Sequence, residues 1–341
     1  IMDSDSFALY RLPQHDDCTL VYGKAQSLLS IGDLEGLSGF VVAPFAIDAS
    51  TPVVLIMPTR EACHDMPFHY RDIQAVLSDS RDIYSRDFAR FHTQLAQDVF
   101  GKIVLARRAS VECSCRAIDM FHKACALYPH AFVALFSTPF SGTWLVASPE
   151  VLLEGHNGCW HTMALAGTMH LDHDLEQLRW SEKNIREQRY VATYISDCLR
   201  PFAHDLKELG PRTVKAGNVV HLRSDFTFGM NDDNACHVIE ALHPTPAVCG
   251  VPKDDALHFI LDNEHCDRRY YSGFSGPMAT DGETHLYVTL RCMEIGKTSC
   301  MLYAGGGLLN DSLEHAEWDE TEAKMHAMKN VINRCSVIKQ I

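Results

Sequence analysis

The run HPTPAVCG at residues 243–250 constrains the fold more than any other short stretch of the chain. Proline fixes φ and lacks a backbone N–H, so neither a helix nor a central strand can continue through this run. Gly250 at its end allows backbone conformations that other residues avoid. We therefore expect a stiff, irregular segment. It is either a surface connector or a segment that shapes a site with His243, Thr245 and Cys249.

The composition is that of an ordinary globular protein, with 341 residues, 46% apolar and 22% charged. The formal net charge of −14 argues against nonspecific nucleic-acid binding. It also means that an anionic substrate would need local cations or a metal ion at its site. The sequence has no apolar stretch long enough to span a membrane and no secretory signal, so we expect a cytoplasmic protein that binds no membrane.

Several apparent motifs are false leads. The 13 cysteines are scattered, which favours a reduced compartment over a disulfide framework. The CSC at 113–115 lacks a second ligand pair at zinc-finger spacing, so we expect no structural zinc. GKT at 296–298 is not a phosphate-binding loop because Arg291 stands where the leading glycine belongs, and GGG at 305–307 does not fit the dinucleotide fingerprint.

Hydrophobic spacing predicts several strands in the first half of the chain. Residues up to about 80 have the pattern of short strands and turns. The alternation in 102–112 places Lys102, Val104 and Ala106 on one strand face. Strands are predicted at 51–57, 102–112, 131–137, 142–148 and 161–167.

Three helices follow from spacings of three and four residues. The first begins at an N-cap, Ser85, and ends before Gly101. The second runs from about Ser181 to Pro201, with Glu187 at the border of its apolar stripe. The third runs from about 311 to 331. The stripes are Phe88, Phe91, Leu95 and Val99; Ile185, Val191, Ala192, Ile195 and Leu199; and Trp318, Thr321, Met325 and Met328.

Four features could converge on one site: Lys102 at the start of a strand, a carboxylate in SPE at 148–150, and the helical carboxylates Glu187 and Glu320. Glu317 and Lys324 lie in a narrow arc with Glu320. Glutamate oxygens suit magnesium better than zinc. Each residue alone has a simpler interpretation as a solvated or strand-end side chain.

Taken in order, nine motifs resemble the chorismate-utilising enzymes, which include isochorismate, salicylate, anthranilate and aminodeoxychorismate synthases. They span roughly residues 100–325. The motifs are KIVLAR (102–107), SPE (148–150), ALAGT (164–168), SEKNIREQ (181–188), HPTPAVCG (243–250), YSGFSG (271–276), LR (290–291), YAGGG (303–307) and EWDETEAK (317–324).

The resemblance implies an α+β fold like that of anthranilate synthase component I, with large β-sheets flanked by helices around a deep central cleft. The sequence contains no repeat or long linker, so we expect one chorismate-binding domain over 1–341. Its N-terminal part, about 1–95, would be variable, and about 96–330 would form the catalytic core. Relatives of this kind lead us to expect a monomer with no obligate protein partner.

Two features favour isochorismate synthase, an isomerase, within the family. Aminodeoxychorismate synthases resemble this chain but carry a nucleophilic lysine where Ala166 stands, so water is the expected nucleophile here. HPTPAVCG resembles the isochorismate synthases at 243–250. The alternatives are a salicylate synthase, an aminating synthase and a chorismate-binding regulatory protein. The sequence does not distinguish menaquinone from siderophore synthesis.

The resemblance also assigns roles to residues. Lys102 would be the general base that activates water, which requires burial to lower its pKa, and Glu150 would be the general acid, with a raised pKa. Glu187, Glu320 and Glu317 would hold Mg²⁺. The positions that would bind chorismate are Gly167, Thr168, His221, Thr245, Tyr271, Arg291, Gly305, Gly306 and Lys324.

Overall fold

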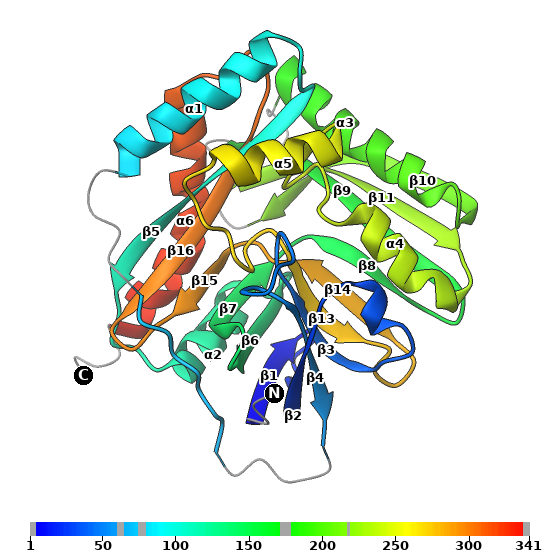
Figure 1. Cartoon of the computed structure of the whole chain (residues 1–341), viewed down its shortest axis with the longest axis vertical. Helices are drawn as coiled ribbons and strands as arrows, with labels where there is room; N and C mark the ends of the chain where they lie inside the picture. Colours follow the sequence, from blue (N-terminus) through cyan, green and yellow to red (C-terminus); the bar gives the residue numbers. More distant parts are fainter. Residues whose placement is uncertain (1–4, 60–64, 74–79, 171–178, 217–218, 337–341) are drawn as a thin grey trace.

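The chain forms one continuous hydrogen-bonded sheet with helices packed against it (Figure 1). The computed structural model describes residues 5–59, 65–73, 80–170, 179–216 and 219–336. In this part of the chain the sheet has 16 strands in the order β10-β11-β9-β8-β14-β13-β3-β4-β2-β1-β6-β7-β15-β16-β5-β12. Every neighbouring pair is antiparallel.

The strands are β1 (Asp5–Arg11), β2 (Thr19–Leu28), β3 (Gly39–Ala43), β4 (Val53–Pro58), β5 (Lys102–Glu112), β6 (Phe132–Thr138), β7 (Gly142–Ser148), β8 (Val151–His156), β9 (Cys159–His170), β10 (His204–Ala216), β11 (Val219–Gly229), β12 (Gly250–Val251), β13 (Phe274–Met278), β14 (Thr284–Val288), β15 (Cys292–Ile295) and β16 (Ser299–Leu308). The helices are α1 (Ser80–Ala96), α2 (Ala117–Leu127), α3 (Glu182–Leu199), α4 (Ala235–Leu242), α5 (Lys253–Asn263) and α6 (Glu314–Ser336), with short 3₁₀ turns at Gly32–Leu34 and Asp232–Asn234.

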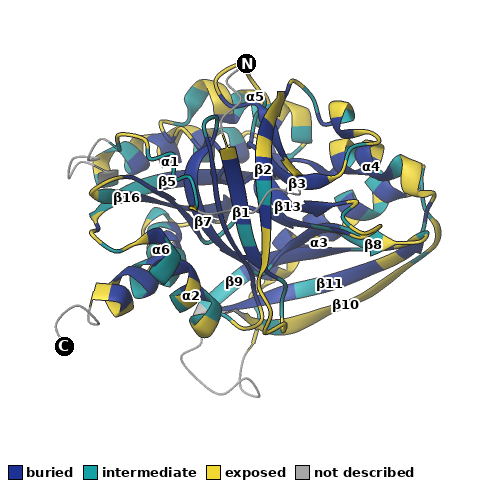
Figure 2. Cartoon of the chain, turned by 90° about the horizontal axis from the view of Figure 1, so that it is seen from below, coloured by how far each residue is buried: buried dark blue, intermediate teal, exposed yellow. Residues whose placement is uncertain are grey.

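Most of the helices pack directly against strands of the sheet. α3 packs on β9 and β11, α1 on β5, α6 on β16, and α2 on β6 and β7. Figure 2 shows dark blue, buried strands in the interior and exposed residues along β10 at the sheet edge. None of the helices in the described residues has both the length and the apolar character needed to cross a membrane.

The strand predictions are confirmed, with shifted ends. Each residue of β6 and β7 is buried, so these strands have continuous apolar runs rather than alternation. β9 extends beyond the predicted 161–167 at both ends. Gly167 is an extra residue in β9, because His221 pairs with Thr168 while Leu222 pairs with Ala166. Its φ of +73° and its approach to Asn184 favour glycine in this bulge.

The helix predictions hold for position but not for every residue. The predicted start of α3 near Ser181 is confirmed, and Ser181 is its N-cap, since its side chain accepts from the Asn184 N–H. Ile185 was wrongly placed in the buried stripe: it is 49% exposed. Ser85 is not the N-cap of α1, which begins at Ser80. Tyr84, four residues before Phe88, extends the buried stripe by a turn.

Two further predictions need correction. Val99 lies beyond the end of α1 and is exposed. The third helix begins at Glu314 and ends at Ser336, and Trp318 is only half-buried between the guanidinium groups of Arg81 and Arg107.

The run at 243–250 is not a surface connector. All of its residues except Ala247 are buried. The Lys253 ammonium donates to the His243 carbonyl at 3.0 Å, and the run ends in β12, which pairs with the start of β5. The run therefore packs against the strand that carries Lys102.

Candidate active site

A pocket lies where the start of β5, the β9 bulge, the end of β16 and helices α3 and α6 meet. Its empty space is about 590 Å³, including the part that opens to solvent. Segments far apart in the sequence thus supply one site. The predicted site residues that line it are Glu150, Gly167, Thr168, Glu187, His221, Tyr271, Arg291, Gly305 and Lys324.

Lys102 is fully buried beside this pocket, and its Nζ lies 3.0 Å from Oε1 of Glu187. A Cβ on Gly307 would lie 2.1 Å from the same oxygen, so only glycine leaves room for this carboxylate. Burial alone would raise the pKa of Glu187, but the charges of Lys102, Lys183 and then Lys324 lower it. Glu187 is therefore ionised and pairs with the ammonium group.

Glu150, unlike Glu187, is protonated at neutral pH. Ser148 fixes the turn before it, since its hydroxyl donates to the Val288 carbonyl at 2.6 Å and accepts from the Glu150 N–H at 3.2 Å. Burial raises the pKa of the Glu150 carboxyl to about 8, although Lys102, Lys324 and Arg291 act to lower it. At neutral pH Glu150 is thus a protonated acid beside cationic groups.

The tautomer of His221 follows from its partners. A guanidinium can only donate, so the 3.1 Å contact from Arg291 makes Nε2 of His221 the acceptor. Nδ1 then carries the hydrogen and donates to the Gly167 carbonyl at 3.2 Å. Burial and the charges of Arg291 and Lys324 hold the pKa of His221 well below its usual range, so the ring is neutral. Arg291 itself adopts φ +45°, a strained conformation for a residue other than glycine.

The two α6 carboxylates face β16 and are each paired with a lysine. Glu317 forms a salt bridge with Lys183, and Glu320 lies 2.6 Å from Lys324. Lys324 also donates to the Gly305 carbonyl at 2.8 Å.

These carboxylates fit a divalent cation in chemistry and direction. Oε2 of Glu317 is buried without a hydrogen-bond partner in the described residues. A Cβ on Gly306 would lie 3.1 Å from this oxygen and 3.8 Å from Oε1 of Glu320, while Glu187 faces Gly307. No three histidine, cysteine, aspartate or glutamate side chains within the described ranges already form a metal-binding group. The lysines that pair with these glutamates would have to move away from the carboxylate oxygens when a cation binds.

The remaining predicted residues lie around the pocket rather than all on its wall. The hydroxyl of Tyr271 faces Gly305, where a Cβ would lie 2.9 Å from it. Thr245 is buried, its hydroxyl has no partner among the described residues, and it is not on the pocket wall. Its neighbours Ala247 and Val248 line the pocket instead.

Sequence reasoning missed these two lining residues and three charged ones. Lys183 pairs with Glu317, and Glu264 pairs with Arg268 next to the pocket wall. The sequence could have indicated the Glu264–Arg268 pair, because opposite charges four residues apart stand just before Tyr271.

The chain is similar to known proteins in sequence and in fold. Residues 60–333 match the family described as chorismate binding enzyme. The vibriobactin-specific isochorismate synthase of Vibrio cholerae is 26% identical over 305 residues, which cover 84% of this chain and 77% of that protein. Isochorismate synthase DhbC of Bacillus subtilis is 35% identical over 196 residues, 54% of this chain and 49% of that protein.

Among solved structures, the menaquinone-specific isochorismate synthase MenF of Escherichia coli has a TM-score of 0.80 at 22% identity, over 96% of this chain and 88% of that one. This likeness confirms the expected α+β fold. With a family match over most of its length, the chain belongs to the chorismate binding enzymes.

Proposed function

We propose that this chain is an isochorismate synthase, an isomerase that converts chorismate to isochorismate. The observation that carries the proposal is that two buried groups able to exchange protons meet at one pocket: Lys102, whose ammonium group pairs with Glu187 and must first release a proton to act as a base, and Glu150, which is protonated because its pKa is about 8. Such a pair is typical of general acid–base catalysis. The isochorismate synthases among the relatives support the same reaction.

In the proposed reaction, Lys102 in its neutral form takes a proton from water as the water oxygen bonds to C2 of chorismate. The ring double bonds shift, the C4–O bond breaks, and Glu150 gives its proton to the departing hydroxyl, which leaves as water. Ala166 lines the pocket where an aminodeoxychorismate synthase would have its lysine. No side chain at that position competes with water.

The anionic substrate needs positive charge around it. We propose that Arg291 and Lys324, with the Tyr271 hydroxyl, bind the substrate carboxylates, and that the backbone of Gly167, Thr168, Gly305 and Gly306 completes the contact. Arginine offers two parallel donors to a carboxylate.

Glu187, Glu320 and Glu317 would hold Mg²⁺, through direct or water-mediated contacts. Bound there, it would supply charge that neutralises the ring carboxylate. The directions of the three carboxylates toward Gly306 and Gly307 support this assignment.

The test is product identification from chorismate with the purified chain alone, with and without Mg²⁺. Isochorismate that forms only with Mg²⁺ supports the proposal. Salicylate and pyruvate as dominant products would instead indicate a salicylate synthase, and an ammonia-dependent product an aminating synthase. One relative is described as vibriobactin-specific and another as menaquinone-specific. We propose that the product of this chain feeds siderophore or menaquinone synthesis.

A further inference from the structure

Lys102 lies at a strand edge with little main-chain support. β12 pairs with this edge only through Gly250–Val251, opposite residues 102–103 of β5. Two more main-chain bonds flank this pairing: the Gly101 N–H donates to the Val251 carbonyl at 3.0 Å, and the Val104 N–H donates to the Cys249 carbonyl at 2.6 Å. Past this point no other strand of the described residues pairs with this edge.

A buried ion pair takes the place of the missing strand. Arg268 donates from NH2 to the Val104 carbonyl at 2.8 Å, and Oε1 of Glu264 accepts from the Ala106 N–H at 2.7 Å. NH1 of Arg268 donates to the Val248 carbonyl at 2.7 Å. Backbone groups that would otherwise be buried without partners are therefore satisfied by two side chains.

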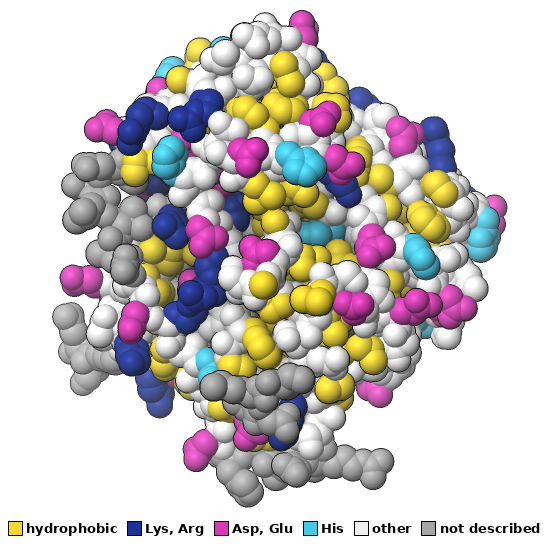
Figure 3. All heavy atoms as spheres, in the orientation of Figure 1, with side chains coloured by type: hydrophobic (Ala, Val, Ile, Leu, Met, Phe, Trp, Pro, Cys, Tyr) yellow, Lys and Arg dark blue, Asp and Glu magenta, His cyan; other side chains and the backbone are white. Residues whose placement is uncertain are grey.

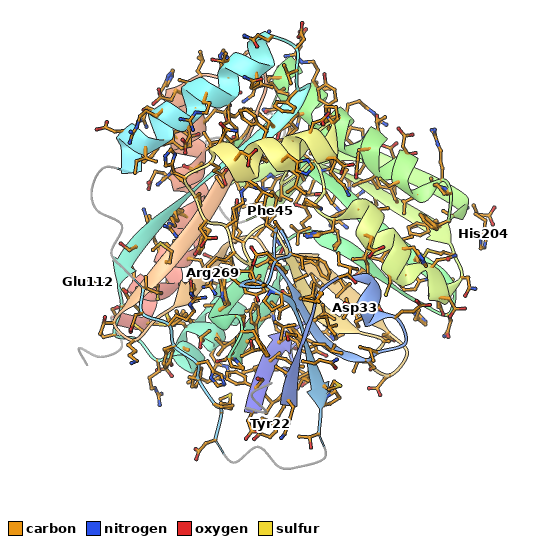
Figure 4. All side chains as sticks on the ribbon, in the orientation of Figure 1. Tyr22, Asp33, Phe45, Glu112, His204 and Arg269 are labelled. Carbon is orange, nitrogen blue, oxygen red and sulfur yellow. The ribbon has the colours of Figure 1, made fainter. Side chains whose placement is uncertain are left out.

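The geometry of this pair requires a guanidinium. Nε and NH2 of Arg268 bind the two oxygens of Glu264 at 2.6 and 2.7 Å, so four of its five N–H groups have partners. The side chains are 2% and 1% exposed. The guanidinium carbon of Arg268 lies 4.2 Å from the centre of the Phe45 ring. Figure 4 labels Phe45 and Arg269, the residue that follows Arg268. A lysine in place of Arg268 could not make this fork of bonds.

We propose that the Glu264–Arg268 pair positions Lys102 for catalysis. The pair joins two walls of the pocket, because Val104 and Val248 both line it and the carbonyls of both accept hydrogen bonds from Arg268. Val104 follows Lys102 by two residues and shares its face of β5. Fixing Val104 therefore fixes the direction of the Lys102 side chain. This inference rests on the proposed function of Lys102.

The test is Arg268→Lys with a matched control, Arg269→Lys. Arg269 is also buried in an ion pair, but its bonds go to Glu294 and to the Ser141 carbonyl rather than to β5. We expect Arg268→Lys to lower kcat about 10-fold or more, with KM for chorismate within about 3-fold, because small misplacements of reacting groups are costly. Arg269→Lys should keep kcat within about 3-fold of the wild-type value, even if it lowers Tm as much as Arg268→Lys does.

Hydrogen exchange by mass spectrometry supplies a readout that does not depend on activity. The segments 102–108 and 245–251 should exchange faster in Arg268→Lys than in the wild type and in Arg269→Lys. Unchanged exchange there, or a kcat loss that merely follows Tm in both variants, overturns the proposal. If Arg268→Lys does not fold, Glu264→Gln is measured in its place. A wild-type chain that makes no isochorismate refutes the proposed function, whereas the exchange result still decides whether the pair holds the edge.

Discussion

Replacement of Glu150 by glutamine should remove catalysis and increase stability at the same time. Glutamine keeps the size of the side chain but cannot give a proton to the departing hydroxyl, so we expect kcat to fall at least ~100-fold. In the wild type the rate should fall as the pH rises through about 8, since the protonated carboxyl is then lost.

The gain in stability follows from the pKa of Glu150. The folded value of about 8 lies above the ordinary 4.5, so the folded state binds more protons than the unfolded state between these values. Stability is therefore complete below pH 4.5 and is lost as the pH rises through 8. From these two values the loss is about 1 kcal/mol at pH 5 and about 4 kcal/mol at pH 8. Glutamine does not titrate and escapes this loss.

Urea unfolding of both proteins at pH 5 and pH 8 measures this difference. The free energy of unfolding of Glu150→Gln, minus that of the wild type, should grow by about 3 kcal/mol between the two pH values. The hydrogen bonds of the glutamine amide contribute equally to the free energy of unfolding at both pH values, so they do not alter this pH-dependent difference. A difference that stays flat with pH would refute the raised pKa, and near-wild-type turnover would remove Glu150 from the mechanism.

Three more changes test the site and the fold. Lys102→Ala should lower kcat at least ~100-fold while the chain stays folded, and normal turnover in steady-state assays would exclude it as the base. Glu320→Gln should raise the Mg²⁺ concentration needed for half-maximal activity, and an unchanged titration would count against its role as a ligand. His161 lies 3.0 Å from Glu154 and 2.9 Å from Asp225. Burial alone would lower the pKa of His161, but these carboxylates raise it above 6.5. The stability that it gives is thus present below pH 6.5 and is lost as the pH rises through the folded value. His161→Gln should therefore destabilise more at pH 6 than at pH 9 in urea unfolding, and equal losses would contradict this reasoning.

Local chemistry in the sequence predicted the elements that carry the site, but not how they meet. Ser181 and the alternation after Lys102 located α3 and β5 correctly. The sheet order depends on contacts between distant segments, and β5 lies between β16 and β12. Spacing alone contains no such information, so the convergence of Lys102, Glu150 and Glu187 could be expected only from the family resemblance.

Periodicity located helix faces better than helix ends. Ser85 was a plausible cap by residue type, yet its hydroxyl donates to Glu314 at 2.7 Å from within α1. Ile185 has the right phase for the α3 stripe but lies in the first turn, where it stays half exposed. Only packing against another element decides whether an apolar residue at such a position is buried.

The run at 243–250 was first a candidate for choosing among sister reactions, and the structure adds a mechanical role. Gly250 admits the Lys102 carbonyl, since a Cβ there would lie 2.7 Å from it. The carbonyls of Val248 and Cys249 bind Arg268 and the Val104 N–H. A change in this run would therefore move Lys102, the proposed general base, as well as the pocket wall.

The pocket holds cationic groups in a chain whose net charge is −14. On the face shown in Figure 3, Lys and Arg side chains gather to one side, while Asp and Glu are more widely spread. In and beside the pocket, Lys102, Lys183 and Lys324 pair with carboxylates, and Glu150 is neutral near pH 7. Arg291 donates to the neutral ring of His221 and forms no salt bridge with a carboxylate of the described residues. Its positive charge therefore faces the pocket in which we propose that the substrate binds. In the proposed mechanism a protonated Glu150 therefore matters twice, because its ionisation would remove the proposed acid and would also offset the positive charge proposed to bind chorismate.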